Sequence, residues 1–504
     1  MDGLAAVCRL AAARFDAAGR IDQAISHMDF ALAMAQGLAD AVLLLQSMKA
    51  PFLVAVGQVA AAGEALARAE ESLARARSPR SAMEYVAIRA AVRCMRLDFA
   101  VTRAVTEDIG RLEQAGEHAQ ASFVMGWLVP LMFAQGEKEA AEPWRQALRV
   151  HAEELDHPYR LADVLSFEFA ARAGWGPAEV EEPPPGHIRS SNPLASYRVH
   201  ALQLRLHLLR ADWPSAEAAL MQIALDGGKI GASAAAMIGG YRAIAAAHRT
   251  PNELPRIGDP PPASLITLGG LFAAAEAVAI AGTQRDAVKW LHWIEHDVPQ
   301  QVRTALEWPV SRERVVALLR ARAGSVREAV RAFRDSIEWA ARAGYECEAA
   351  LAQVQLAEVL SLAEVSSSER ARSRLRRSGW MKLQELEIDP TPHAYAATRA
   401  LAMREDVATR PQLTPRQVGV LSLLAEGMTY REAAERLGTS WRTVSTQAYQ
   451  TYERLGVSGK FDAVRAARRL QILEPRRGMR LAAGPSPDAQ IAPWSRSAVM
   501  RPQS

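Results

Sequence analysis

The hydrophobic pattern of this chain repeats along most of its length. An apolar helix ends at a small residue, a polar turn follows, and an Ala-rich helix begins. This pattern recurs at Gly19, Gly57, Gly136, Gly174, Asp212, Gly282 and Gly324, with looser copies near Asp98 and Thr250. From Gly19 to Gly324 there are eight steps in 305 residues, a mean of about 38. That period predicts a solenoid of two-helix repeats, each of which buries its apolar stripe against its neighbours.

The copy at Gly324 shows the physical basis of one repeat. Gly324 can adopt the left-handed conformation that ends a helix. Ser325 can accept N–H groups at the start of the next helix, with Glu328 three residues further on. Apolar side chains then follow at spacings of three and four, on one helical face: Val326, Ala329, Val330, Phe333 and Ile337.

Composition favours an all-α chain, because Ala and Leu are abundant and aromatic residues make up only 6%. The repeats resemble tetratricopeptide-like helical hairpins in architecture, although no copy carries the full repeat signature. An irregular helical bundle with similar hairpins is the alternative, and the steady period favours the solenoid. We therefore predict a TPR-like helical-hairpin solenoid, followed by a small module of four helices.

Three interruptions indicate the organisation of the chain. Residues 181–193 contain Pro183-Pro184-Pro185-Gly186, and residues 250–262 contain five prolines, so both predict loops or hinges. Between Pro390 and Pro411 the repeats give way to a different pattern. We expect a helical repeat domain for sensing or interaction (1–390), a linker (391–411), a basic module (412–473) and a disordered tail (474–504).

The first two helices of the module carry clear end signals. Thr414 can cap the first helix, with Gln417 completing a capping box, and Gly427 ends it. Thr429 can cap the second helix, with Glu432 three residues later. The positions expected to be buried are Val418, Leu421 and Leu424 in the first helix and Ala433, Ala434 and Leu437 in the second.

The third helix of the module is predicted from Trp441 to Leu455, after a tight turn capped by Ser440, and a fourth from Lys460 to Leu470. The buried face of the third helix is expected to consist of Val444, Ala448, Thr451 and Leu455. The opposite face presents Arg442, Ser445, Thr446, Tyr449 and Gln450. Two short helices joined by a tight turn, the second with a polar outer face, have the geometry that enters a major groove.

The module resembles the C-terminal helix-turn-helix of LuxR-type transcriptional regulators, which are bacterial DNA-binding proteins. The resemblance covers about 60 residues, 413–473. It rests on Leu413-Thr414-Pro415-Arg416, Leu423-Leu424-Ala425-Glu426-Gly427, Glu432, Ala434, Arg436-Leu437-Gly438, Ser440, Thr443-Val444, Leu455-Gly456-Val457 and Ala463-Val464. It implies that the third helix binds double-stranded DNA as part of a homodimer.

By position, the resemblance implies that the DNA-binding residues are Arg416, Thr429, Ser440, Trp441, Arg442, Thr443, Ser445, Thr446, Tyr449, Gln450 and Lys460. It also implies a dimer contact at Ala463, Val464 and Ala467 of the fourth helix. Independently of the family, Arg and Lys neutralise phosphates, while Gln and Arg can make paired hydrogen bonds to base edges. The chain departs from the family pattern at Gln417, Ser445, Gln447 and Gln450, where the family usually has Glu, a basic residue, His and Asn.

The distribution of charge agrees with an attached nucleic-acid-binding unit. The net charge of the whole chain is only +4. Residues 412–480 carry 12 Arg or Lys against 6 Asp or Glu, and the remaining tail is +1, which leaves −3 for residues 1–411. The module is therefore basic and the body mildly acidic.

Some large LuxR-type regulators carry an ATPase domain before a helical repeat region and this module, and the chain resembles only the last two parts. The phosphate-binding pattern G-x-x-x-x-G-K-[ST] is absent, since Gly228-Lys229 precedes Ile230 and Gly459-Lys460 precedes Phe461. A receiver or acyl-homoserine-lactone sensor would need a β-sheet that the pattern does not predict. We expect no cofactor.

Other features favour structural roles. His292-Trp293-Ile294-Glu295-His296 matches the H-x-x-E-H pattern of zinc proteases, but surface histidines on a helix with Trp290, Leu291 and Ile294 in the core is the simpler interpretation. Trp127, Trp175, Trp213 and Trp293 are interpreted as packing residues, with a ligand groove as the alternative.

The cysteines and the apolar segments indicate a cytoplasmic protein. Three dispersed cysteines, Cys8, Cys94 and Cys347, indicate neither a disulfide framework nor a zinc site. Residues 264–282 predict a packed helix and not a membrane span, because they are rich in Ala and Gly. The N-terminal residues lack the basic start of an export signal.

The sequence thus predicts a cytoplasmic, non-enzymatic transcriptional regulator, whose repeat domain senses an unknown small molecule or protein and controls the DNA-binding module. An interaction scaffold with a degenerate helix-turn-helix is the main alternative, and a zinc hydrolase is a weaker one.

Overall fold

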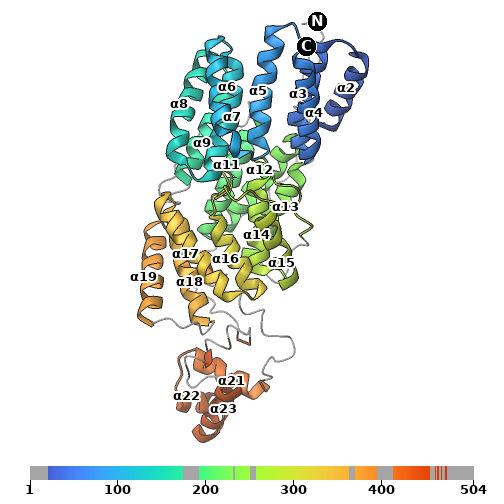
Figure 1. The fold of residues 1–504 in the computed structure, drawn as a ribbon. Helices are drawn as coiled ribbons and strands as arrows, with labels where there is room; N and C mark the ends of the chain where they lie inside the picture. Colours follow the sequence, from blue (N-terminus) through green and yellow to red (C-terminus); the bar gives the residue numbers. More distant parts are fainter. Residues whose placement is uncertain are drawn as a thin grey trace, which may run out of the picture. The chain divides into compact units, whose positions relative to one another are not determined.

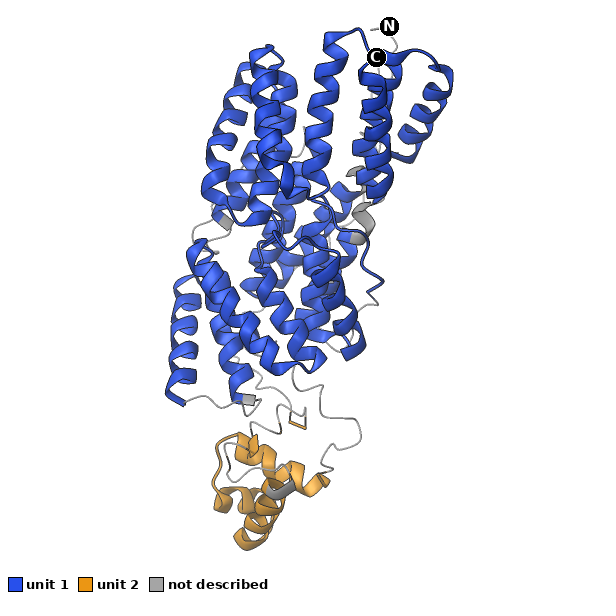
Figure 2. Cartoon of the chain, in the orientation of Figure 1, with its two compact units in different colours: residues 1–406 blue, residues 407–504 orange. Residues whose placement is uncertain are grey.

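A computed structural model of the chain describes residues 21–173, 192–230, 233–249, 257–362, 369–393 and 413–454, together with residues 460, 463, 464, 467, 472 and 473. The chain forms two compact units, residues 1–406 (unit 1) and residues 407–504 (unit 2), which Figure 2 colours separately. The predicted turns at Gly19, Gly174 and Thr250, as well as Cys8, Trp175, Leu455 and the tail from residue 474, lie outside the described residues.

The described residues form an all-α structure that contains no strand, as predicted. The helices of unit 1 (Figure 1) are α2 (Ile21–Met34), α3 (Ala39–Ala55), α4 (Val59–Leu73), α5 (Pro79–Met95), η1 (Phe99–Val101), α6 (Thr102–Gln114), α7 (His118–Gln135), α8 (Lys138–Glu154), α9 (Pro158–Ala173), α11 (Pro193–Leu209), α12 (Trp213–Ile230), α13 (Ser233–Arg249), α14 (Leu268–Ala281), α15 (Gln284–His296), α16 (Arg312–Ala323), α17 (Val326–Arg342), α18 (Glu346–Leu362) and α19 (Glu369–Glu385). They pack in sequential pairs such as α3 with α4 and α16 with α17. Their description as tetratricopeptide-like repeats stays a prediction.

The helices of unit 1 are of two kinds. In α14 every residue from Leu268 to Ile280 is buried, and α7 is buried around most of its circumference. By contrast α17 buries one stripe that includes Ala329, Val330 and Phe333, as its apolar spacing predicts. Because a helix that is apolar all round must be covered on every side, helices such as α7 and α14 form an inner layer and amphipathic helices such as α17 an outer one.

Most of the predicted turns join consecutive helices. Gly57, Gly136 and Gly324 adopt left-handed conformations, with φ of +79°, +81° and +97°, so each can end its helix without steric strain. The prediction that Ser325 caps α17 is wrong, because its side chain makes no capping hydrogen bond. The turn at Gly324 is therefore stabilised by the glycine and not by its neighbour.

The helices α13 and α14 approach each other closely at two glycines. A Cβ atom on Gly270 would lie 2.5 Å from Cα of Met237, and one on Gly240 would lie 1.9 Å from the carbonyl oxygen of Gly270. Only glycine allows two backbones to come this near. The Ala- and Gly-rich composition of residues 264–282 therefore serves helix packing. No helix among the described residues is long and apolar enough to cross a membrane.

Arg314 of α16 is the centre of a buried ionic cluster. Its guanidinium donates hydrogen bonds to Glu276 at 2.6 Å and to Glu348 at 2.7 Å, and the three side chains are at most 7% exposed. Arg205 of α11 pairs with Glu348, and the indole N–H of Trp308 donates to Glu276 at 3.0 Å. Burial alone raises the pKa of Glu276, but the charges of Arg314 and Arg205 outweigh it and hold that pKa at about 2. The cluster links α11, α14, α16 and α18.

A second buried ionic cluster connects α9, α11 and the segment that precedes α16. Arg198 of α11 pairs with Asp163 of α9 at 3.1 Å and with Glu307, which precedes α16, at 3.2 Å. The side-chain amide of Asn192, the N-cap of α11, donates to Asp163 at 2.9 Å. Residues distant in sequence are thus held together by charge-assisted hydrogen bonds inside the body.

The ends of two inner helices are completed by loops from far along the chain. The carbonyl of Met95, at the end of α5, accepts the N–H of Leu265 at 2.8 Å. The carbonyl of Ala134, near the end of α7, accepts the N–H groups of Arg303 and Thr304 at 2.7 and 3.2 Å. These bonds satisfy helix-end carbonyls that have no partner within their own helix.

The packed part of unit 1 reaches His393, which is 4% exposed. One of its ring nitrogens lies 3.4 Å from the carbonyl oxygen of Leu209, and its own carbonyl accepts the side-chain amide of Gln355 at 3.4 Å. Gln355 in turn accepts a hydrogen bond from Arg314. Burial, together with the neighbouring His248, lowers the pKa of His393 to about 3. Residues 391–393, predicted to open the linker, are therefore part of the body.

Unit 2 contains α21 (Pro415–Ala425), α22 (Tyr430–Arg436) and α23 (Trp441–Arg454). These three agree with the predicted helices, whereas the predicted fourth helix lies largely outside the described residues. The core of the unit comprises Val420, Leu421, Leu424, Ala433, Ala434, Val444, Ala448, Tyr452, Ala463, Ala467 and Leu473.

Two positions of unit 2 that were predicted to be buried, Leu437 and Val418, are not fully buried. Leu437 was expected to face inward, but it is the C-cap of the short helix α22, beyond its last full turn, and is 42% exposed. Gln417, in contrast, is 2% exposed because its side chain closes the capping box with Thr414. Val418 is only half-buried.

Candidate nucleic-acid interface

The geometry of α22 and α23 is set by their caps and by the turn between them. Gly438 has a φ of +62°, which lets the chain reverse direction directly after α22. The hydroxyl of Ser440 then accepts the backbone N–H of Thr443 at 3.1 Å and begins α23, as predicted. Each of these signals is local, so the sequence was sufficient to find the turn.

The start of α22 is a complete capping box. The hydroxyl of Thr429 accepts the N–H of Glu432 at 3.3 Å, and the carboxylate of Glu432 accepts the N–H of Thr429 at 2.7 Å. The bond from the backbone N–H of Thr429 lowers the pKa of Glu432. The helix therefore begins at a fixed residue, which positions the turn and α23 behind it.

A pair of tyrosines fixes α23 against α22. The hydroxyls of Tyr430 and Tyr452 lie 2.9 Å apart, and Tyr452 is 4% exposed. Burial, followed by the hydrogen bond with Tyr430, raises the pKa of Tyr452. No local sequence pattern predicts this pair, because the two tyrosines are 22 positions apart.

The helix α23 has one buried and one outward face. Val444, Ala448 and Thr451 are fully buried, as predicted, and Tyr452 joins them. Of the predicted outward residues, Arg442, Thr446, Tyr449 and Gln450 are exposed, while Ser445 is half-buried. Trp441, at the first position of the helix, is 56% exposed, and Tyr449 is 65% exposed. Two large aromatic side chains left in water on one short helix indicate a contact surface.

The residues implied to bind DNA lie on α21, at the N-cap of α22, in the turn, along α23, and at Lys460 beyond it. Arg416, Thr429, Ser440, Trp441, Arg442, Thr443, Thr446, Tyr449 and Gln450 are exposed, and Ser445 and Lys460 are half-buried. The ammonium of Lys460 donates to the carbonyls of Gly427 at 3.4 Å and Met428 at 2.7 Å, beyond the end of α21. Lys460 therefore has a capping role within unit 2 that the sequence analysis did not foresee.

Two further cations lie near the interface. Arg431 and Arg436, on α22, are exposed, and the sequence analysis did not assign them to DNA. The available signal was their position on the helix directly before the turn. Together with Arg416 and Arg442 they supply positive charge on each of the three helices.

The predicted dimer contact is only partly accessible. Ala463 and Ala467 are fully buried in the core of unit 2, so their side chains are occupied within one copy. Val464 is half-buried. A dimer through this region would have to use Val464 and its surroundings, and the dimer stays a prediction.

Comparison with protein families identifies the class of this unit. Residues 411–467 match the family described as "Bacterial regulatory proteins, luxR family". The match covers 57 of the 504 residues and includes the whole of α21, α22 and α23. A helix-turn-helix of this family suggests DNA-binding transcriptional regulation. A search of curated proteins finds no match to the chain.

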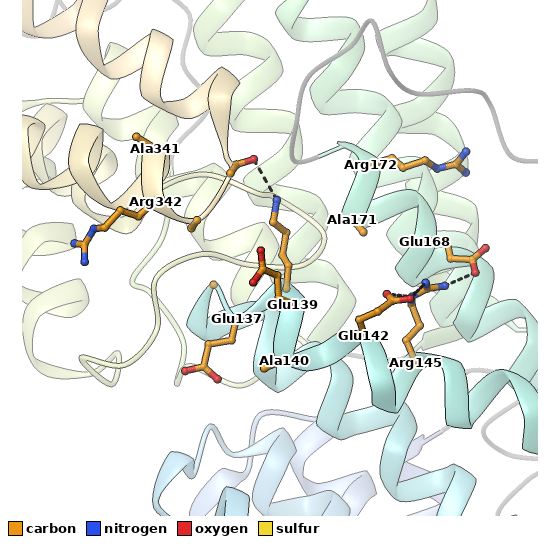
Figure 3. A pocket seen from close by; sticks show the side chains of 14 residues that line it. Glu137, Glu139, Ala140, Glu142, Arg145, Glu168, Ala171, Arg172, Ala341 and Arg342 are labelled. Carbon is orange, nitrogen blue, oxygen red and sulfur yellow. Dashed lines mark hydrogen bonds and ion pairs between the residues drawn. The ribbon is translucent and has the colours of Figure 1, made fainter.

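Unit 1 contains a cleft with a volume of about 1000 Å³ (Figure 3). It lies where the start of α8, the end of α9 and the turn after α17 meet. Arg145 of α8 pairs with Glu142 and with Glu168 of α9. Lys138, also on α8, donates to the carbonyl of Gly344, after α17, at 3.2 Å. Burial lowers the pKa of Lys138 to about 8. Several charged groups of the walls thus already pair with one another.

The H-x-x-E-H pattern lies on α15. His292 and His296 are exposed and stack with ring centroids 4.1 Å apart, while Glu295 pairs with Arg320 at 2.8 Å. Trp290 and Ile294 are buried, as the structural interpretation predicted. The described residues contain no group of three or more His, Cys, Asp or Glu side chains arranged to hold a metal ion.

The tryptophans and cysteines that were interpreted as structural are at least partly buried where the structure describes them. Trp293 is buried, and Trp127 and Trp213 are half-buried against the core. Cys94 and Cys347 are buried free thiols, and burial raises the pKa of both to about 12. Their thiols therefore stay protonated and unreactive at neutral pH.

Proposed function

We propose that this protein is a sequence-specific, DNA-binding transcriptional regulator of the cytoplasm. In this proposal residues 412–473 bind double-stranded DNA, and the body, which extends to the buried His393, senses a small molecule or a protein partner. The residues between His393 and residue 412 form the linker. The observation that carries the proposal is the outward face of α23, which follows a capped turn inside a unit that matches a family of regulators.

The chemistry of unit 2 supports this assignment. Its exposed arginines can neutralise phosphates, and the polar side chains of α23 can contact base edges. A homodimer would place two copies of α23 in successive major grooves, roughly 34 Å apart. The ionic clusters give unit 1 a defined internal packing, and its cleft offers a surface for an effector. Both features support a sensing role for this unit.

Selection from random double-stranded DNA with the full-length protein tests the proposal directly. We expect enrichment of one sequence, in two copies if the protein binds as a dimer. Binding to that sequence should weaken steeply between 50 and 200 mM salt, because phosphate contacts release counterions. A complex whose affinity does not depend on salt would contradict the assignment.

Arg442→Ala tests the role of α23 within the folded protein. We expect a loss of affinity of roughly tenfold or more for the selected sequence, since one good base contact contributes about 1–3 kcal/mol. Arg377→Ala, at an exposed arginine of α19, is the matched control and should bind like the unaltered protein. Undiminished binding by the Arg442 variant would argue against α23 as the DNA contact.

The alternative function, an interaction scaffold, predicts a different result in cells. Crosslinking of the protein to chromosomal DNA should give discrete sites if the protein is a regulator. An absence of such sites, with stable protein partners recovered, would favour the scaffold.

A further inference from the structure

The outward face of α23 has an unusual chemical make-up. Its exposed side chains are two aromatic rings, two threonines, one amide and one guanidinium, from Trp441, Arg442, Thr443, Thr446, Tyr449 and Gln450. From Trp441 to Tyr452, the part of α23 whose side chains the structure describes, there is no carboxylate and Arg442 is the only cation. The face is therefore mostly apolar or neutral, although the unit around it is basic.

Both threonines on this face use their hydroxyls locally. The hydroxyl of Thr446 donates to the carbonyl of Arg442, one turn earlier, at 2.9 Å. The hydroxyl of Thr443 lies 2.8 Å from that of Ser440 in the cap. Each of these hydroxyls already makes a hydrogen bond within the cap or the helix. Each threonine therefore offers a partner its methyl together with the acceptor lone pair that its hydroxyl has left.

Each base pair presents its own donors and acceptors in the major groove, so a base preference can be predicted from the side chains of this face. The C5-methyl of thymine is recognised by apolar groups, including threonine methyls and aromatic rings. Adenine is recognised by the paired hydrogen bonds of Gln or Asn, guanine by Arg or Lys, and cytosine by a carboxylate that accepts from its amino group. The face offers several groups for thymine, Gln450 for adenine, Arg442 for one guanine, and no carboxylate for cytosine.

The spacing of the residues sets the length of DNA that they can read. Arg442, Thr446 and Gln450 are four residues apart, so they lie along one stripe of the helix. Eight residues of α-helix rise about 12 Å, which corresponds to about four base pairs at roughly 3.4 Å each.

We propose that α23 reads an A·T-rich core of about four base pairs in each half-site, with a single guanine at the end that meets Arg442. This inference rests on the proposed function and names the DNA that the same interface selects. Gln450 contacts an adenine at the other end of the core, and the Thr446 methyl contacts a thymine between them.

Selection from random duplexes with the full-length protein is the first test. The expected core has at least three A·T pairs and one G·C pair with its guanine at one end. A core containing two or more G·C pairs would overturn the inference while leaving the proposed function intact. Failure to bind any duplex at low salt would instead contradict the proposed function itself.

Removal of methyl groups from the DNA is the second test. Replacement of one contacted thymine by deoxyuridine should lower affinity about fourfold, since one buried methyl contributes about 0.8 kcal/mol. Thr446→Ser removes the protein methyl and should abolish this difference, whereas Thr446→Val keeps a methyl and should retain it. Equal affinity of the unaltered protein for thymine and uracil duplexes would overturn the inference.

A change of specificity is the third test. Gln450→Glu should shift the preferred base at the far end of the core from adenine to cytosine, with a change in relative affinity of roughly tenfold or more. The unaltered protein and Arg377→Ala serve as controls for folding and for total DNA binding. An unchanged preference for adenine in the Gln450 variant would show that this side chain does not read the base.

Discussion

The two units of this protein use charge in opposite ways. In unit 1 the charged groups Arg314, Glu276 and Glu348 are buried together and satisfy one another. Among the residues of unit 2 whose side chains are described, the buried polar ones are Gln417 and Thr451, which are both neutral. Arg416, Arg431, Arg436 and Arg442 are in water. Net charge therefore says little about function until each charge has been placed inside or outside.

The difference has a physical cause. A buried ion must be paired, because removing it from water costs several kcal/mol that only a close partner can offset. The buried charges of unit 1 therefore specify how its helices fit together. Charges on the surface of unit 2 keep their hydration and remain available to a phosphate.

The largest effect should follow from breaking the central ionic cluster. Arg314→Met leaves Glu276 and Glu348 buried without their main partner, and we expect it to destabilise unit 1 by about 3–5 kcal/mol. Unfolding followed by circular dichroism in urea should show the loss. Arg377→Met, at an exposed arginine of α19, should change stability by less than about 0.5 kcal/mol. Equal stability of the two variants would mean that the cluster is not important for stability.

A pair of glycine substitutions compares packing in the two units. Gly270→Ala would place a Cβ 2.5 Å from Cα of Met237, and we expect it to cost about 3 kcal/mol as α13 and α14 are pushed apart. Gly419→Ala, in α21, meets no atom within 4 Å and should stabilise unit 2 by about 0.5–1 kcal/mol. Thermal melting of both variants checks the signs, and destabilisation by Gly419→Ala would contradict the open surroundings of that residue.

Acid should weaken unit 1 through His393. Its folded pKa, about 3, lies below the usual value of 6.5, so its contribution is present above pH 6.5 and is lost as pH falls towards 3. This residue alone predicts a loss of about 2 kcal/mol between pH 7 and pH 5. His393→Asn should flatten that part of the stability profile, whereas His292→Asn, at an exposed histidine, should not. Identical pH profiles for both variants would argue against the buried position of His393.

The smallest expected difference concerns helix caps. Thr429→Ala removes a side chain that accepts the N–H of Glu432 and should destabilise unit 2 by about 1 kcal/mol. Ser325→Ala should be nearly neutral, because Ser325 makes no capping bond. A larger effect at Ser325 than at Thr429 would reverse this assignment.

Local signals explain which features could be predicted from the sequence. The turn at Gly324, the caps at Thr414 and Thr429 and the buried stripe of α23 each depend on residues within one or two helical turns. The ionic cluster was not predictable in this way. Glu276 is the single charge among residues 264–282, but its partner Arg314 is 38 residues further on and no local pattern connects the two.

The residues of the candidate interface show the same distinction between local signals and tertiary contacts. The outward residues of α23 were found from helical periodicity, whereas the hydroxyl pair of Tyr430 and Tyr452 and the capping role of Lys460 depend on tertiary contacts. Leu437 was misplaced because periodicity continues past the point where a two-turn helix actually ends.

The distant loops that complete α5 and α7 have a consequence for synthesis of the chain. Met95 leaves the ribosome 170 residues before Leu265, the residue whose N–H its carbonyl accepts. At about 5–20 residues per second, that delay is roughly ten to thirty seconds. The ends of α5 and α7 are therefore made early but receive their last backbone hydrogen bonds only after Leu265 and Arg303 have been synthesised.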